Sequence, residues 1–322
     1  MTFAVMLASS IGIGMVFLYG CVGEIITEKS GHLNLGIPGI MCMGTAGGCF
    51  GAALYKSGLA YGAEGNAFVL TLCALIFCIL FSALGGLIYA FLTVTLRCNQ
   101  NITGLALTTF GSGFGQYFMD NVVKKDYLAS ASRTMKNFLP AAWGESAFGK
   151  IFLSHGFLIY LAIFVAIIAA LVLRRTKIGL NLRAVGENPA TADAAGINVN
   201  AYKYSAIIIG ASIAGIGGLC YIMNYIGGTW ENSSTIQAMG WLSIALVIFT
   251  LWKPDLSIIG SILFGALYIL SNYISVANNV KRLVELLPYV VTVIVLIVTS
   301  IIGKKETQPP ASLGLNYFRE ER

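Results

Sequence analysis

The sequence predicts an all-α protein that crosses a membrane many times, with about eight to ten spanning helices. Charged residues make up 11% of the 322 residues, against about 25% in a typical soluble protein. Hydrophobic residues make up 57%, and the mean hydropathy is +0.79. Because so few charges would not cover the surface of a soluble protein of this length, the class is a polytopic membrane protein.

Nine apolar runs of helical length supply the predicted spans. They cover residues 1–20, 33–55, 66–96, 102–119, 151–173, 204–226, 238–252, 256–276 and 286–302. The first run lacks a basic n-region and a clear cleavage site, so we interpret it as a retained span rather than a signal peptide. The third run is long enough for one strongly tilted helix or for a span plus a short re-entrant piece. Together the runs predict one transmembrane domain over residues 1–303, followed by a cytoplasmic tail over residues 304–322.

The distribution of Lys and Arg predicts which loops face the cytoplasm. The segment Arg174–Lys203 contains five Lys or Arg residues and two acidic residues, and the C-terminal tail opens with two lysines. The loop at 227–238 contains neither Lys nor Arg. Because basic loops stay in the cytoplasm, Arg174–Lys203 and the tail are expected inside, and the loop around Trp230 outside. Counting spans back places residues 120–150 outside as well, although they carry five Lys or Arg residues.

Helix-breaking residues at two places predict interrupted helices at membrane depth. The first place is the start of the second run, within residues 30–41, and its residues are Gly31, Asn34, Gly36, Pro38 and Gly39. The second is Gln237–Trp241, at the start of the seventh run. Backbone groups freed by a break need partners, so a break is tolerated only where it is buried or lines a watery cavity. Two such breaks suit a translocation pathway, and the alternative at each place is an ordinary junction between a loop and a helix.

The predicted spans contain almost no ionisable side chains, which narrows the function. Apart from Tyr and Cys, the only one is His155, at the edge of a span. Ion-coupled transporters and intramembrane enzymes place charged residues in the membrane in spite of the cost, so we expect neither class and assign no catalytic residue. The seven cysteines show no CxxC pair and no His partner at metal spacing, so no metal site is predicted. The net charge of +6 reflects Lys and Arg beside the spans, not a nucleic-acid-binding face.

The polar residues within the spans are mostly neutral. They include Thr103, Thr108, Thr109, Ser112, Gln116, Ser205, Ser212 and Asn224. Such residues usually form hydrogen bonds between helices, and a subset fits a path for an uncharged polar solute. Glycines at small-xxx-small spacing, such as Gly44 and Gly48, predict close helix packing.

A short capped helix is predicted inside the basic segment Arg174–Lys203. Asn188 is a favoured N-cap residue, and Pro189 is favoured at the first helical position. The Ala-rich stretch Pro189–Ala195 then supplies about two turns, and Gly196 follows where helices commonly end with glycine. A helix capped at both ends fits a docking surface in the cytoplasm, and the alternative is a surface helix that merely joins two spans.

Four blocks of the sequence, in order, resemble one family. They are GEIITEKSGHLNLGIPGIMCMGTAGG (23–48), LRCNQNITGLALTTFGSG (96–113), RAVGENPATADAAGINVNAYKY (183–204) and MGWLSIALVIFTLWKPDLSIIGSILFGAL (239–267). The chain resembles the bacterial ABC-importer permeases for nucleosides and simple sugars, a family related to branched-chain amino-acid permeases, and within it the nucleoside branch. The first block departs from the family pattern at His32, Asn34 and Pro38.

The resemblance implies a bacterial cell-membrane importer of two permeases and two ATPase subunits, fed by an extracytoplasmic solute-binding lipoprotein. The two permeases are usually different subunits in nucleoside systems. ATP and Mg²⁺ would be bound by the partner ATPase, so this chain is expected to hold no cofactor and to be no enzyme. The expected partners are those subunits and membrane lipid, and nucleic acid is not expected.

Two sets of functional residues follow from the capped helix, the break and the resemblance. The residues expected to contact the ATPase are Gly186, Glu187, Asn188, Pro189, Ala192, Asp193 and Gly196. The residues expected to line the translocation pathway are Asn34, Gly36, Pro38, Gly39, Asn99, Thr108, Ser112 and Trp241. Nucleosides are the expected solute. The alternatives are simple sugars of the ribose or galactose type, another small neutral solute, or a stand-alone channel or facilitator.

Overall fold

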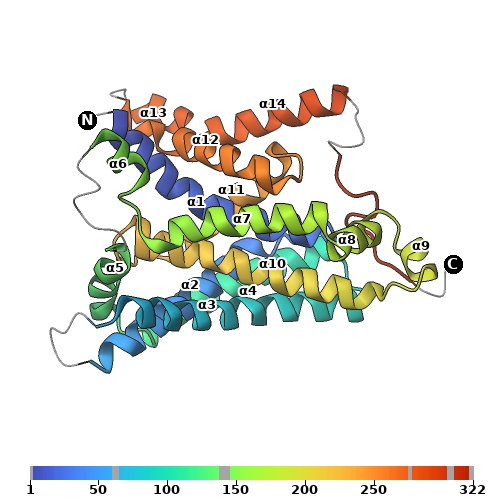
Figure 1. The fold of residues 1–322 in the computed structure, drawn as a ribbon, viewed down its shortest axis with the longest axis horizontal. Helices are drawn as coiled ribbons and strands as arrows, with labels where there is room; N and C mark the ends of the chain where they lie inside the picture. The colour runs from blue at the N-terminus through green and yellow to red at the C-terminus, as the bar shows by residue number, and fades with distance from the viewer. Residues whose placement is uncertain (1–2, 60–64, 138–145, 275–277, 303–307, 319–322) are drawn as a thin grey trace.

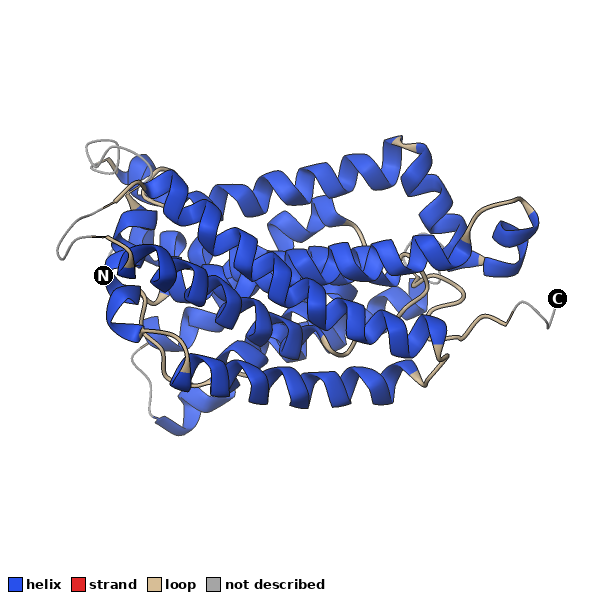
Figure 2. Cartoon of the chain, turned by 90° about the horizontal axis from the view of Figure 1, so that it is seen from below, coloured by secondary structure: helices blue, strands red, loops and turns tan. Residues whose placement is uncertain are grey.

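The computed structural model describes residues 3–59, 65–137, 146–274, 278–302 and 308–318, which form a bundle of helices without any strand (Figure 1). The helices are α1 (Phe3–Glu28), α2 (Ile37–Ser57), α3 (Ala67–Ala90), α4 (Gln100–Asn121), α5 (Leu128–Lys136), α6 (Ala147–Phe152), α7 (Phe157–Arg175), α8 (Lys177–Glu187), α9 (Pro189–Ala194), α10 (Val199–Cys220), α11 (Ser233–Phe249), α12 (Pro254–Tyr273), α13 (Asn278–Val284) and α14 (Leu287–Ile302). Three short 3₁₀ or π turns adjoin these helices: Phe91–Thr95 after α3, Lys125–Tyr127 between α4 and α5, and Tyr221–Tyr225 after α10. Figure 2 shows the same all-helical architecture from below.

Each of the nine predicted runs forms a helix, and the all-α membrane fold is confirmed. Within the described residues, six helices are long and apolar enough to cross a membrane: α1, α2, α3 with its π turn, α7, α10 with its π turn, and α12. The third run is one continuous helix over Ala67–Thr95, of 29 residues, so it needs no re-entrant piece. The other three runs form α4, α11 and α14. Of these, α11 has 17 residues and α14 has 16, whereas α4 has 22.

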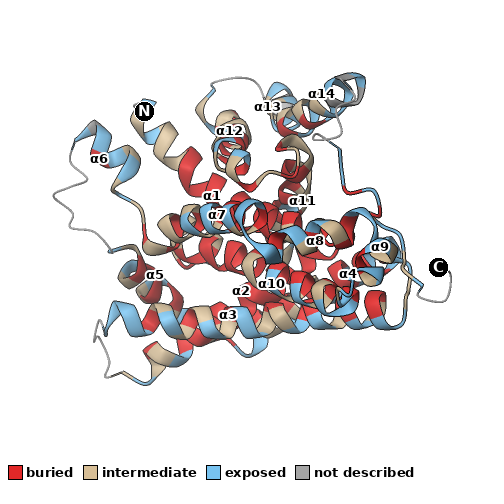
Figure 3. Ribbon diagram, turned by 45° about the vertical axis from the view of Figure 1, so that its right-hand side comes forward, coloured by how far each residue is buried: buried red, intermediate tan, exposed pale blue. Residues whose placement is uncertain are grey.

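The core of the bundle is formed by α1, α2 and α10, which the other helices surround (Figure 3). In the most apolar part of α2, 89% of the residues are buried, whereas the corresponding value for α3 is 22%. The central helices approach closely because their contacts are made by small residues: a Cβ atom on Gly44 would lie 2.5 Å from the Cα atom of Gly215. This is the packing that small-xxx-small spacing predicts.

The bundle separates the segments that the charges assign to opposite sides of the membrane. The segments expected in the cytoplasm, α8, α9 and the C-terminal tail, lie together at one end (Figure 1). The helices α5 and α6, which begin within the segment expected outside, lie at the opposite end with the start of α1. The two ends are called the cytoplasmic end and the outer end after this prediction. Lys304 and Lys305, the two lysines at the start of the tail, lie outside the described residues.

At the first predicted break the structure shows the alternative, a junction between a loop and a helix. Residues between Glu28 and Ile37 form a mostly buried loop that joins the separate helices α1 and α2, and Pro38 and Gly39 lie within α2. This loop is called the break below. The predicted break at Gln237–Trp241 is wrong, because these residues lie inside the continuous helix α11. Gly240 serves packing instead, since a Cβ atom there would lie 2.4 Å from the Cα atom of Pro38. The glycine that suggested a break is the residue that lets α11 approach the start of α2.

Candidate functional site

The capped helix in the basic segment forms as the sequence predicts. The side chain of Asn188 accepts a hydrogen bond from the backbone N–H of Thr191, at 3.0 Å, and Pro189 is the first helical residue. At the other end, Gly196 has φ of +83°, and the N–H of Ile197 donates to the carbonyl of Ala192 at 3.0 Å. Both caps are formed by neighbouring residues, and α9 is a short capped helix that ends one residue earlier than predicted.

The predicted ATPase-contacting residues divide between two faces of α9. Ala192 is 3% exposed and packs against Val185 and Val199 inside the chain. Asp193 is half-buried and accepts a hydrogen bond from the Tyr317 hydroxyl at 2.8 Å. Of the predicted residues, Glu187, Asn188 and Gly196 are exposed, and so are the neighbouring Thr191, Ala194 and Ala195. A docking partner would meet this exposed set, whereas Ala192 anchors the helix to its own protein.

Gly186 connects the segment that carries α9 to the break before α2. Its backbone is so close to Lys29 that a Cβ atom at Gly186 would lie 2.3 Å from the Lys29 carbonyl oxygen. The Gly186 carbonyl also accepts a hydrogen bond from the N–H of Ser312, at 3.1 Å. The α8–α9 segment therefore lies directly against the backbone that leads into α2.

The described part of the tail, residues 308–318, contacts α9, the end of α8 and the loop between α1 and α2. These segments and the tail are called the cytoplasmic assembly below. The N–H of Gly314 donates to the Gly31 carbonyl at 3.1 Å, and the Asn316 side chain donates to the Arg97 carbonyl at 2.7 Å. The tail thus joins the α1–α2 loop, the α3–α4 turn and α9. Sequence reasoning treated it only as a tail; the cluster Leu315, Tyr317 and Phe318 in an otherwise polar stretch was the available signal.

The backbone of the α1–α2 loop is satisfied by side chains from neighbouring helices. The N–H of Asn34 donates to the Glu24 carboxylate at 2.8 Å, and the Thr108 hydroxyl donates to the Leu35 carbonyl at 2.7 Å. The Tyr89 hydroxyl donates to the Leu33 carbonyl at 2.6 Å. Irregular backbone inside a helical bundle needs such partners, so these residues are what allow the break to persist.

The predicted pathway residues fall into two groups. Five lie together around the break: Asn34, Gly36, Pro38, Gly39 and Thr108. The other three are spread out. Asn99 is exposed and caps the start of α4, Ser112 donates to the Thr109 carbonyl of its own helix at 3.2 Å, and Trp241 is half-buried in α11.

Sequence reasoning missed two buried acidic residues. It ended the first span at residue 20, but α1 continues to Glu28, and Glu24 and Glu28 are 0% and 3% exposed. The conclusion that the interior holds no ionisable group except His155 is therefore wrong. The physical reason is local: Glu24 accepts from the loop backbone, and Glu28 accepts from the Trp252 indole N–H. Acidic residues four apart, directly before a helix break, were the signal.

His32, in the loop between α1 and α2, is 1% exposed. Burial, with a smaller contribution from the Lys203 charge, holds the pKa of His32 well below its usual value of 6.5. Among the described residues, no cluster of three or more His, Cys, Asp or Glu side chains is arranged to bind a metal ion.

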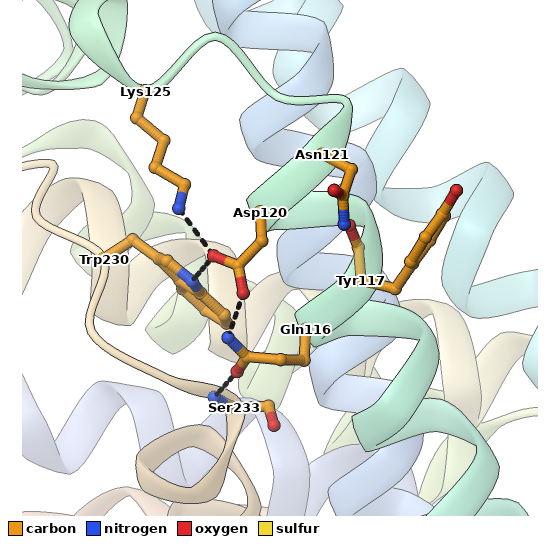
Figure 4. A network of polar contacts seen from close by, with 7 residues as sticks. All are labelled: Gln116, Tyr117, Asp120, Asn121, Lys125, Trp230 and Ser233. Carbon is orange, nitrogen blue, oxygen red and sulfur yellow. Dashed lines mark hydrogen bonds and ion pairs between the residues drawn. The ribbon is translucent and has the colours of Figure 1, made fainter.

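The opposite end of the bundle carries an exposed polar network centred on Asp120 (Figure 4). Its carboxylate pairs with Lys125 at 2.5 Å and accepts from the Trp230 indole N–H at 3.2 Å. Gln116 donates to the same carboxylate and accepts from the N–H of Ser233 at 2.7 Å. These hydrogen bonds, that from Lys125 above all, lower the pKa of Asp120. The network joins the end of α4 to the loop that contains Trp230, called the outer loop, and to Ser233 at the start of α11.

Comparison with known proteins agrees with this architecture. The model of the family described as "Branched-chain amino acid transport system / permease component" matches residues 6–297. The chain is 29% identical to the nucleoside ABC transporter permease protein NupC of Lactococcus lactis, over 99% of this chain and 98% of that one. It is 28% identical to the guanosine ABC transporter permease protein NupQ of Bacillus subtilis, over 94% and 92%. It is 31% identical to the "Putative glucose ABC transporter permease protein" of Haloferax volcanii, over 83% and 77%.

These relatives are transport subunits rather than enzymes, and their similarity covers the helical bundle, the break and the capped helix alike. The match extends over nearly the whole chain and agrees with a multi-pass location in the cell membrane. The chain therefore belongs to the family of permease components of branched-chain amino acid transport systems, as an ABC transporter permease.

Proposed function

We propose that this chain forms the translocation pathway of an ABC importer for nucleosides, driven by a separate ATPase subunit. The observation that carries the proposal is the contact of Gly186 with Lys29, which links the capped helix α9 to the break before α2. A transport subunit that receives its energy from a partner needs such a link between its docking surface and its membrane-embedded part.

In the proposed mechanism, ATP and Mg²⁺ are bound by the partner, and closure of the ATPase displaces α9. A rigid helix passes on this displacement, whereas a flexible loop would absorb it. Glu187, Asn188 and Gly196 are exposed where the partner would bind. The displacement reaches Lys29 through Gly186, and then the loop that precedes α2. Because side chains of α1, α3 and α4 hold that loop, its movement changes the packing at the proposed pathway residues.

The proposed assembly contains a second, different permease and an extracytoplasmic solute-binding lipoprotein. The chain also matches the nucleoside ABC transporter permease protein NupB of Lactococcus lactis, at 23% identity over 58% of this chain. Two differently named permeases of one organism are thus similar to this chain, which supports a heterodimeric pair.

The substrate is tested by uptake of labelled solutes into cells with and without this gene. We expect nucleoside uptake to disappear with the gene and to return when the gene is restored. A simple sugar is the second candidate, because the Haloferax volcanii relative is 31% identical. Unchanged nucleoside uptake together with lost glucose or ribose uptake would refute the nucleoside proposal and favour the sugar.

A further inference from the structure

Helix α4 reaches from one end of the bundle to the other. At the cytoplasmic end, the Gln100 side chain donates to the Leu315 carbonyl of the tail at 3.3 Å. At the outer end, Asp120 holds Trp230 of the outer loop. With 22 residues the helix is long enough to cross a membrane, yet it is not one of the six helices that are also apolar enough.

The exposed residues of α4 and those of its neighbour α3 differ in kind. The exposed residues of α3 are all apolar: Ala67, Phe68, Val69, Leu72, Ile76, Ile79, Leu80, Leu84 and Leu87. The exposed residues of α4 are mixed: Asn101, Ile102, Leu105, Ala106, Thr109, Phe110, Gly113, Tyr117, Asp120 and Asn121. Lipid tails suit the surface of α3, whereas the surface of α4 offers hydroxyl and aromatic groups that lipid does not need.

The middle of the α4 surface has an open site between two aromatic side chains. Phe110 and Tyr117 are 53% and 64% exposed, and Gly113 lies between them on the same face. A Cβ atom at Gly113 would have no atom within 4 Å. The hydroxyl of Thr109 is exposed on the same face, one turn before Gly113. No charged residue occurs between Asn101 and Tyr117, so the surface suits an uncharged ligand.

The other side of α4 packs against the break, the loop that receives the displacement of α9 in the proposed mechanism. A Cβ atom on Gly111 would lie 2.5 Å from the Gly39 carbonyl oxygen, and Thr108 holds the Leu35 carbonyl. Helix α4 therefore lies between the loop before α2, on its buried side, and the exposed face that carries Gly113.

We propose that this exposed face of α4 lines the aqueous solute pathway and that Phe110 and Tyr117 are surfaces on which a nucleobase stacks. The inference rests on the proposed function, because the solute is taken to be a nucleoside. Aromatic side chains bind bases through their π-faces with little dependence on the base, which suits a transporter for several nucleosides. The Thr109 hydroxyl is placed to form a hydrogen bond with the ribose.

Cysteine accessibility tests whether water reaches this face. In the complete transporter, with the partly exposed Cys73 and Cys98 replaced by Ser, Gly113→Cys is compared with Leu80→Cys. Leu80 is a matched control: it is 56% exposed on α3, next to Phe81, whose ring lies 5.9 Å from that of Phe114. A thiol needs its thiolate form to react, so a water-soluble thiol reagent should modify Gly113→Cys at least about tenfold faster than Leu80→Cys. Equal inertness of the two variants overturns the inference.

Protection by solute tests the stacking. We expect adenosine to slow modification of Gly113→Cys, and ribose to leave it unchanged. Replacing Tyr117 by Leu should weaken the protection, and Tyr117→Trp should retain it. If neither solute protects while nucleoside uptake is normal, the stacking site is overturned and the proposed function stands. If ribose protects and adenosine does not, while only sugar uptake depends on the gene, the nucleoside function fails together with the stacking site.

Discussion

Two networks at opposite ends of the bundle differ in the kind of contact that forms them. In the network around Gly186, backbone meets backbone: Gly186 lies against Lys29, and the tail donates hydrogen bonds to both the Gly186 and Gly31 carbonyls. In the network around Asp120, exposed side chains meet (Figure 4). Exposed ion pairs contribute little to stability. We infer that the network around Gly186 moves as a unit and that the network around Asp120 separates more easily.

The largest effect is expected from Gly186→Ala. The added Cβ atom would lie 2.3 Å from the Lys29 carbonyl oxygen, so the α8–α9 segment and the loop must separate. Overpacking of this kind costs about 1–3 kcal/mol, and we expect solute uptake to fall about tenfold or more. The measurement is labelled-solute uptake, normalised to the amount of protein in the membrane.

Gly58→Ala is the matched control for that variant. Gly58 ends α2 near the outer end of the bundle, and a Cβ atom there would meet its nearest neighbour at an ordinary 3.6 Å. It should transport normally. Equal losses in both variants, or none in either, would show that the Gly186–Lys29 contact does not carry the displacement.

A variant that breaks α9 itself should also lose solute uptake. Ala192→Pro removes the N–H that donates to the Asn188 carbonyl at 3.0 Å, and it disturbs a side chain that is 3% exposed. We expect uptake to be lost while solute still binds to the external binding protein. Survival of both uptake and solute-stimulated ATP hydrolysis would refute the docking role of α9.

A moderate effect is expected from Tyr317→Phe, which removes the hydrogen bond from the tail to Asp193. A hydrogen bond to a charged group contributes about 1.5–3 kcal/mol when buried and less at this half-exposed site, so uptake should fall about two- to fivefold. Tyr160→Phe is the control, because it removes a tyrosine hydroxyl that donates at the outer end, in this case to the backbone carbonyl of Phe152. If the two variants behave alike, the tail has no special role in coupling.

A pH effect is expected at the cytoplasmic end because of His32. Burial lowers the pKa of His32 in the folded protein, so below the unfolded value of about 6.5 only the unfolded chain takes up the proton. The contribution of neutral His32 to the free energy of unfolding is therefore complete above pH 6.5, and it falls as the pH drops below that value. The thermal unfolding midpoint in detergent should be lower at pH 5.5 than at pH 7.5. His32→Gln should reduce this difference, and an unchanged difference would contradict the assignment.

The smallest effect is expected from Asp120→Asn at the outer end. The substitution keeps the shape of the side chain and removes its charge, so the ion pair with Lys125 is lost. Because both partners are exposed, uptake should change by less than about twofold and stability hardly at all. A loss of uptake as large as that of Gly186→Ala would contradict the inference that the network around Asp120 separates more easily than the network around Gly186.

The sequence predicted those features that depend on neighbouring residues. The caps of α9 follow from Asn188 and Gly196, which act on the backbone beside them, and the break before α2 follows from a local cluster of Gly and Pro. The same reasoning failed at Gly240, because its contact with Pro38 comes from a distant part of the chain. It also ended α1 too early, because the burial of Glu24 depends on the Asn34 backbone folding back to it. The contacts of the tail were not predicted for the same reason, because its partners are remote in sequence.

The position of Ser312 has a consequence for biosynthesis. Its partner Gly186 precedes it by 126 residues. At a synthesis rate of about 5–20 residues per second, the tail residue Ser312 is made roughly 6–25 s after Gly186. The cytoplasmic assembly is therefore completed only after α14 has been made.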